Sequence, residues 1–128
     1  MKAKITHIGI YTTDLERMKE FYETYFEAES NQKYVNSKGF SSYFLTFGNE
    51  ARLEIMAHEQ LVQREVIDLA NGMNHLAFSV GSREAVLALT KRLTDAGYPF
   101  LSPPRVTGDG YFESRIADPD GNPIEITE

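Results

Sequence analysis

The fold is decided by the stretch Thr6-His-Ile-Gly-Ile-Tyr-Thr-Thr-Asp-Leu-Glu-Arg-Met-Lys-Glu-Phe-Tyr22. Its first part alternates apolar with small or polar residues, and this period of two predicts a strand over 5–11. Thr13 or Asp14 can then cap a helix that runs through Ala28, because a side-chain oxygen at this place accepts hydrogen bonds from free backbone amides. Apolar residues recur along one face of that helix. The chain therefore begins with a strand and an amphipathic helix.

The same order of elements is predicted twice along the chain. In the first half, strands are expected over 29–35, 40–47 and 52–56, separated by turn residues. In the second half, a strand over 74–80 precedes a helix over 82–96 that Gly97 ends, and strands follow over 98–101, 111–117 and 124–127. Apolar residues at helical spacing predict a connecting helix over 58–72, with Gly72 as its stop.

These elements predict an α+β fold made of two βαβββ modules, about 1–57 and 73–128, joined by the helical connector. A length of 128 residues suits a single domain over 1–128. A βαβββ unit of this size cannot cover both faces of its sheet alone. We therefore expect the modules to pack into a curved mixed sheet with the helices on its outer face.

Composition narrows the classes of partner. The net charge of −6 disfavours nucleic acids and anionic membranes as partners. No stretch approaches the roughly 20 apolar residues that a membrane helix needs, and residues 1–5 lack the apolar segment of a signal peptide, so a cytoplasmic location is expected. The chain has no cysteine, which leaves histidines and carboxylates as the available metal ligands.

Two histidines and two glutamates occupy matching places in the two modules. His7 and His75 lie in the opening strands, and Glu54 and Glu125 lie in the closing strands. Neighbouring residues of a strand point to opposite faces of the sheet. All four side chains therefore leave the helix-covered core if their aliphatic neighbours turn toward it; these neighbours are Ile8, Leu53, Ile55, Leu76, Ile124 and Ile126.

Two imidazoles and two carboxylates on one face would suit a borderline divalent cation such as nickel, cobalt or zinc. The alternative interpretation is that these residues are ordinary solvated positions of an exposed sheet face, which is the usual place of a single histidine or glutamate. The matched placement in both halves favours one metal site.

Several segments together carry a family resemblance. They are Thr6-His-Ile-Gly-Ile-Tyr11, Asp14-Leu-Glu-Arg-Met-Lys-Glu-Phe-Tyr22, Leu53-Glu-Ile55, Asn74-His-Leu-Ala-Phe78 and Ala117-Asp-Pro-Asp-Gly-Asn-Pro-Ile-Glu-Ile126. The whole chain resembles the vicinal oxygen chelate superfamily, and the ligand order His, Glu, His, Glu resembles that of glyoxalase I. Glu54 is the discriminating residue, because related epimerases usually have glutamine at this place.

The resemblance implies a small-molecule substrate, commonly a homodimer, and a metal-dependent lyase that isomerises the hemithioacetal of a thiol and methylglyoxal. Glu125 and Glu54 are the expected catalytic residues, since a carboxylate next to the metal can move a proton between adjacent carbons. Glutathione-dependent bacterial glyoxalases have an arginine on the first strand and an asparagine after the second ligand. Neither is found here, which argues against glutathione as the thiol, and the short chain favours nickel or cobalt over zinc.

Four further residues are candidate walls of a substrate pocket. Tyr11, Met56 and Ser79 share strand parity with the ligands, and His58 shares it if its strand persists. Ordinary surface packing, or an exposed loop position for His58, is the competing interpretation. Core or dimer-interface packing is favoured over ligand stacking for the aromatic run of Phe40, Tyr43, Phe44 and Phe47. A surface ion pair is favoured for Arg52.

The same fold hosts several functions, so the fold alone does not assign one. A non-catalytic binder of an antibiotic or metabolite, or a thiol transferase, is the alternative function.

Overall fold

The computed structural model describes residues 1–65 and 69–128. The chain divides into two compact units, Met1–Arg64 and Glu65–Glu128.

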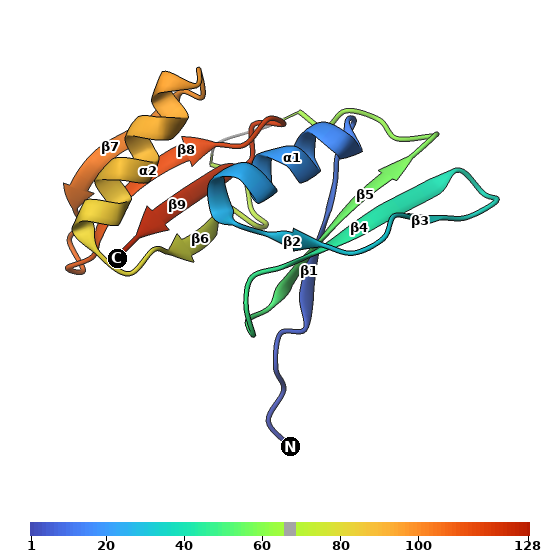
Figure 1. The fold of residues 1–128 in the computed structure, drawn as a ribbon, viewed down its shortest axis with the longest axis horizontal. Helices are drawn as coiled ribbons and strands as arrows, with labels where there is room; N and C mark the ends of the chain where they lie inside the picture. The colour runs from blue at the N-terminus through green and yellow to red at the C-terminus, as the bar shows by residue number, and fades with distance from the viewer. Residues whose placement is uncertain (66–68) are drawn as a thin grey trace. The chain divides into compact units, whose positions relative to one another are not determined.

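The first unit is a mixed sheet covered by one helix (Figure 1). Its elements are β1 (His7–Tyr11), α1 (Leu15–Phe26), β2 (Glu29–Ser30), β3 (Tyr34–Val35), β4 (Phe40–Thr46) and β5 (Arg52–His58). The strand order is β1-β5-β4-β2, and β3 also pairs with β4. Strand β1 runs parallel to β5, whereas β4 pairs antiparallel with β5, β2 and β3.

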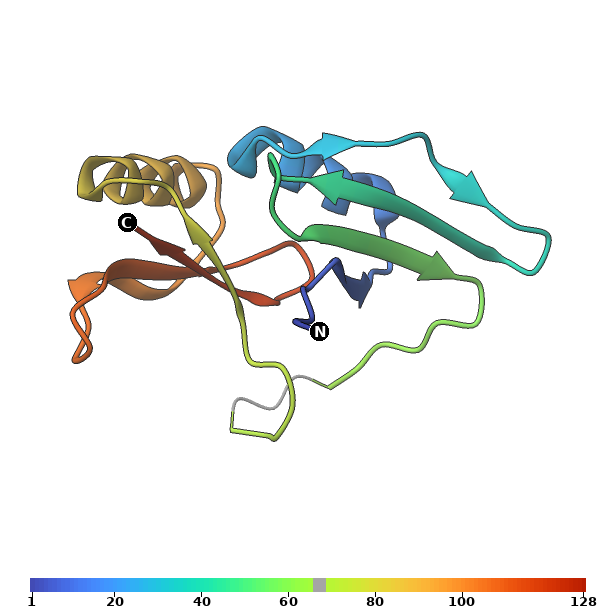
Figure 2. The ribbon, with the colours of Figure 1, turned by 90° about the horizontal axis from the view of Figure 1, so that it is seen from below.

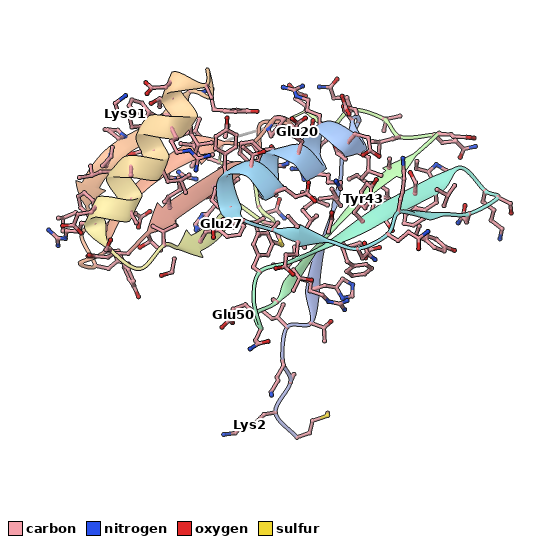
Figure 3. All side chains as sticks on the ribbon, viewed as in Figure 1. Lys2, Glu20, Glu27, Tyr43, Glu50 and Lys91 are labelled. Atoms are coloured by element: carbon pink, nitrogen blue, oxygen red, sulfur yellow. The ribbon has the colours of Figure 1, made fainter. Side chains whose placement is uncertain are left out.

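Helix α1 is held by capping at both ends and by one buried face. The side chain of Asp14 accepts a hydrogen bond from the Arg17 amide at 3.1 Å, so Asp14 is the N-cap. Glu27 ends the helix in the left-handed region with φ 54°, and Figure 3 labels it at this end. The helix packs on β4 and β5. The buried apolar residues of the helix and these strands are Leu15, Met18, Phe21, Tyr22, Tyr43, Leu45, Leu53 and Ile55.

The second unit repeats the plan with a four-stranded sheet. It contains β6 (Leu76–Ser79), α2 (Arg83–Asp95), β7 (Phe100–Val106), β8 (Phe112–Ala117) and β9 (Pro123–Thr127), with the strand order β6-β9-β8-β7. Strand β6 is parallel to β9, and the other pairs are antiparallel. Figure 2 shows α2, in gold, over one face of this sheet. The helix contacts β7, β8 and β9. The core of this unit includes Val86, Leu89 and Leu93 from α2, and Ile116, Ile124 and Ile126 from β8 and β9.

A tight turn leads β8 into β9 and sets their register. The Asp118 Oδ1 atom accepts hydrogen bonds from the amides of Asp120 and Asn122, each at 2.9 Å. An aspartate that bonds its own backbone in this way closes a turn without needing a metal. The register that results places Arg115 directly opposite Glu125.

The predicted α+β fold with two βαβββ modules is confirmed, with three differences in detail. The strand expected over 29–35 is divided into β2 and β3, and β7 continues to Val106 through irregular pairing instead of ending at Leu101. The connecting helix expected over 58–72 is absent from its described part, since β5 continues to His58 and no helix forms over 59–65 or 69–72. Residues 66–68 of that prediction lie outside the described residues.

The physical reason for the missing helix is that its apolar stripe has nothing to cover. Val62 and Leu69 are 83% and 97% exposed. Helices in proteins are stabilised mainly by burial of an apolar face, and propensity alone does not sustain a short helix. Neither of the helices in the described part of the chain is long and apolar enough to span a membrane.

Candidate metal centre

The first unit brings His7 and Glu54 together on the sheet face that α1 does not cover. His7 opens β1, and β1 pairs with β5 so that Gly9 lies opposite Glu54. His7 and Glu54 are therefore diagonal neighbours. The His7 Nε2 and Glu54 Oε2 atoms are 3.6 Å apart, and both side chains remain partly accessible. One imidazole nitrogen and one carboxylate oxygen thus face each other at the start of β1.

Two neighbours orient the His7 ring. The Thr6 hydroxyl lies 3.0 Å from His7 Nδ1, and the Phe44 ring meets the imidazole edge to face, with centroids 5.3 Å apart at 76°. Phe44 lies opposite Glu54 across the β4–β5 pair, and the Arg52 guanidinium lies 4.5 Å from its ring centroid. Phe44 therefore supports the His7 side of the site and stacks on Arg52.

The prediction of core or dimer-interface packing for the aromatic run is confirmed for Tyr43, which lies in the core, whereas Phe44 is only partly buried and its dimer-interface role stays a prediction. Tyr43 is 8% exposed in the core, whereas its neighbour Phe44 lies on the opposite face beside His7. Alternation within the strand indicates that the two residues differ in face. Alternation alone does not say whether Tyr43 or Phe44 shares a face with Glu54, because that depends on the pairing register of β4 and β5.

The second unit brings His75 and Glu125 together in the same way. His75 immediately precedes β6 and Glu125 lies on β9. The His75 Nε2 and Glu125 Oε2 atoms are 3.1 Å apart. The other Glu125 oxygen, Oε1, lies 3.6 Å from the Arg115 Nε atom, which is buried without a hydrogen-bond acceptor. This pair is therefore tighter than the first and carries an adjacent cation.

A third acidic residue, Glu113, lies next to the second pair and was not identified from the sequence. Glu113 on β8 is 7% exposed, and its carboxyl group interacts with the Glu125 carboxylate. Burial raises the pKa of Glu113, and the neighbouring Glu125 carboxylate raises that pKa further. Alternation along the predicted strand over 111–117 could have placed Glu113 and Arg115 on one face, but the pairing with Glu125 required the structure.

Burial within each unit agrees with the predicted strand parity. Leu53, Ile55, Ile124 and Ile126 are at most 2% exposed in the two cores. Ile8 and Leu76, at the starts of their strands, are partly buried. The four proposed ligands alternate with these residues and point away from the helix-covered sides. Among the described residues, no group of three or more histidines and carboxylates is arranged so that it could hold a metal ion.

The predicted pocket residues lie on the ligand faces by strand parity. Tyr11 and Met56 pair with each other across β1 and β5, and β5 persists to His58. The His58 Nδ1 atom accepts the Gln60 amide at 3.0 Å, so the neutral ring carries its hydrogen on Nε2. Ser79 follows two residues after Ala77, which lies opposite Glu125.

The residues present fit a divalent metal of the nickel, cobalt or zinc class. Each pair offers an imidazole Nε2 and a carboxylate oxygen, which is the donor set that such ions accept. Small residues, Gly9 and Ala77, lie directly opposite the two carboxylates and leave room beside them. Apart from the two chain neighbours of Gly9, the described atoms that a Cβ at this place would meet within 4 Å are Met56 Cε at 3.0 Å and Met56 Sδ at 3.9 Å, both at the flexible end of that side chain.

The chain is similar to known proteins over nearly its whole length. The chain is 29% identical over 128 residues to the uncharacterised protein YqjT of Bacillus subtilis, with 94% of each chain covered. It is similar to the crystal structure of a glyoxalase family protein from Enterococcus faecalis, with a TM-score of 0.79, 30% identity, and coverage of 98% of this chain and 97% of that one.

The fold is also that of a trypanothione-dependent glyoxalase I of Leishmania major, with a TM-score of 0.80, 21% identity, and coverage of 99% of this chain and 87% of that one. Residues 4–126 match the family described as the glyoxalase/bleomycin resistance protein/dioxygenase superfamily. The chain therefore belongs to the glyoxalase/bleomycin resistance protein/dioxygenase superfamily.

Proposed function

We propose that the chain is a metal-dependent lyase or isomerase of the glyoxalase I type. Its substrate would be the hemithioacetal of a thiol and methylglyoxal, or a related molecule with two vicinal oxygens. The observation that carries the proposal is the repeated pair of a histidine and a glutamate, with Nε2 to Oε2 distances of 3.6 Å for His7 and Glu54 and 3.1 Å for His75 and Glu125. Membership of the superfamily supports it.

His7, Glu54, His75 and Glu125 would together hold one nickel, cobalt or zinc ion. When bound, such an ion supplies positive charge that stabilises the negative charge developing on the two vicinal oxygens. Glu54 and Glu125 then provide the proton transfer. One carboxylate removes the proton from the carbon that carries sulfur and hydroxyl, and a carboxylate returns a proton to the neighbouring carbon, so that the hemithioacetal becomes a hydroxy thioester.

Other residues of the two ligand faces would contact the substrate. Tyr11, Met56, His58 and Ser79 are the proposed pocket residues. His58 lies four residues beyond Glu54 on β5, or about 13 Å along a strand. It would therefore contact the distal part of a substrate through its Nε2–H group. A homodimer is the proposed assembly, as the resemblance to glyoxalase I implies.

The proposal is tested by metal content and turnover measured on the same preparations. The wild type, His7→Ala and Glu125→Gln are assayed with nickel, cobalt, zinc or manganese, and with methylglyoxal plus glutathione, trypanothione or other small thiols. We expect stoichiometric metal and hemithioacetal consumption in the wild type. Both variants should lose turnover at least about 100-fold, as removal of a direct participant in the reaction does.

Glu50→Gln is the matched control, because Glu50 is an exposed residue of the turn between β4 and β5. This variant should bind metal and turn over like the wild type. Bound metal with no turnover for any combination of thiol and metal would contradict the glyoxalase activity. A wild type that binds no metal would contradict the metal centre as well.

A non-catalytic small-molecule binder is the second candidate function. The name of the matched superfamily includes a bleomycin resistance protein, and no three metal-binding groups are gathered anywhere among the described residues. Ligand binding by a metal-free wild type, measured by calorimetry with candidate antibiotics or metabolites, would favour this function over the lyase.

A further inference from the structure

Asn74 links His75, the histidine of the second pair, to the positively charged side chain of Arg115. Its Oδ1 atom lies 2.8 Å from His75 Nδ1 and accepts a hydrogen bond from Arg115 Nη2 at 3.0 Å. The same arginine approaches Glu125 Oε1 with its Nε atom, at 3.6 Å. Arg115 therefore lies next to both members of the pair, directly beside the glutamate and through Asn74 beside the histidine.

The donors and acceptors around Asn74 allow one arrangement. A guanidinium group has donors and no acceptor, so the Asn74 atom that faces Arg115 must be the carbonyl oxygen. That oxygen cannot donate. The Nδ1 atom of His75, at 2.8 Å from it, must therefore carry a hydrogen, because the other tautomer would place two lone pairs against each other. The Nε2 atom is then the ring nitrogen that faces Glu125 Oε2, at 3.1 Å; since two lone pairs would repel there as well, these two atoms need a hydrogen or a metal ion between them.

We propose that Asn74 and Arg115 are positioning residues that reserve His75 Nε2 for a metal ion. This inference deepens the proposed function and rests on it for the metal. Arg115 fixes the orientation of the Asn74 amide, and Asn74 holds the Nδ1–H group and the plane of the His75 ring. Partners of this kind behind a histidine ligand commonly contribute 10- to 100-fold to metal affinity.

The first unit offers an internal contrast. The neighbour of His7 Nδ1 is the Thr6 hydroxyl, at 3.0 Å. A hydroxyl can donate or accept, so this contact does not select a tautomer of His7. The structure thus assigns a fixed tautomer to the ligand of the second unit and a selectable one to the ligand of the first.

The test measures the His75 ring and the metal affinity separately. Nitrogen-15 NMR of labelled histidine side chains in the metal-free full chain reports whether Nδ1 carries a hydrogen, and zinc calorimetry gives the affinity. In the wild type and in Asn74→Asp, which keeps an acceptor, we expect the protonated Nδ1. In Asn74→Leu we expect a mixture of tautomers in the neutral ring and zinc affinity about 10- to 100-fold weaker.

Arg115→Lys should also lower the affinity, because an ammonium does not reproduce the planar fork of the guanidinium. Asn49→Leu, an exposed residue of the turn before β5, is the matched control and should change neither readout. Thermal unfolding confirms that each variant is folded, and Asn74 is itself exposed.

The inference is overturned if Nδ1 of the wild-type His75 lacks a hydrogen. It is also overturned if Asn74→Leu binds zinc as tightly as the wild type. A wild type that shows the protonated Nδ1 but binds no zinc would contradict the proposed function while supporting the hydrogen-bond network. The two failures are therefore distinguishable.

Discussion

Gly9 and Ala77 are small residues at equivalent places in the two units. Each lies in a parallel strand pair directly opposite a proposed carboxylate ligand, Gly9 opposite Glu54 and Ala77 opposite Glu125. A large side chain here would compete with the carboxylate and the histidine for the same space above the sheet. The small size of Gly9 and Ala77 therefore leaves space for the carboxylate and imidazole groups of the proposed site.

Gly9→Ala should leave stability within about 1 kcal/mol of the wild type. The new methyl group would lie 3.0 Å from Met56 Cε, which is the end of a flexible chain and can move. Gly9 needs no positive φ, so alanine also reduces the entropy of the unfolded chain. Urea unfolding measures the difference. Met56→Ala in the same background should remove any remaining cost; an equal loss of several kcal/mol with and without Met56 would show a backbone clash instead.

At the scale of elements, α1 is tied to the sheet by charge as well as by its apolar face. The Glu16 Oε1 atom accepts hydrogen bonds from Lys33 Nζ and from the Tyr43 hydroxyl, both at 3.0 Å. Tyr43 is labelled on β4 in Figure 3. The hydrogen bond from Lys33 is the main cause that lowers the pKa of Glu16. This contact links the first turn of α1 to the segment between β2 and β3.

Lys33→Gln should raise the pKa of Glu16 toward its ordinary value, as measured by carboxyl carbon-13 NMR titration. A carboxyl whose folded-state pKa is lowered stabilises the fold above its unfolded-state pKa, and this contribution disappears as the pH falls through the folded-state pKa. The stability difference between wild type and variant should therefore be present at neutral pH and vanish in acid. It should be small, because the Glu16 side chain is 59% exposed.

Lys38→Gln removes the same charge from the turn before β4 and serves as the control. It should leave the Glu16 titration unchanged. A Glu16 titration that is identical in Lys33→Gln and in the wild type would show that the ion pair does not persist in solution.

At the scale of the whole molecule, the proposed centre depends on groups from both units. Each unit supplies one imidazole and one carboxylate, and ligands from one pair alone leave a divalent ion with two protein donors. Metal ligands brought from separate parts of a chain couple metal binding to folding. Loss of either His–Glu pair should therefore weaken metal binding to a similar extent.

Zinc should raise the thermal stability of the wild type, by about 2.7 kcal/mol when its free concentration is 100 times the dissociation constant. His7→Ala and His75→Ala should each lose most of this effect, and the double variant should lose little more than either single one. Differential scanning calorimetry with and without zinc measures all four proteins. Stabilisation that survives intact in one single variant would assign the metal to the other pair alone and refute the shared site.

The sequence by itself determined the two βαβββ modules, the start of the first helix at Thr13 or Asp14, and the parity that sends His7, Glu54, His75 and Glu125 away from the apolar cores. These features are local, since hydrophobic period and capping chemistry act over a few neighbouring residues. Only the tertiary structure decided that Phe44 supports His7 and that Glu113, Arg115 and Asn74 surround the second pair. It also decided that the described part of the connector is not helical. These depend on strand register and on which surfaces find a partner, and neither is encoded within a single segment.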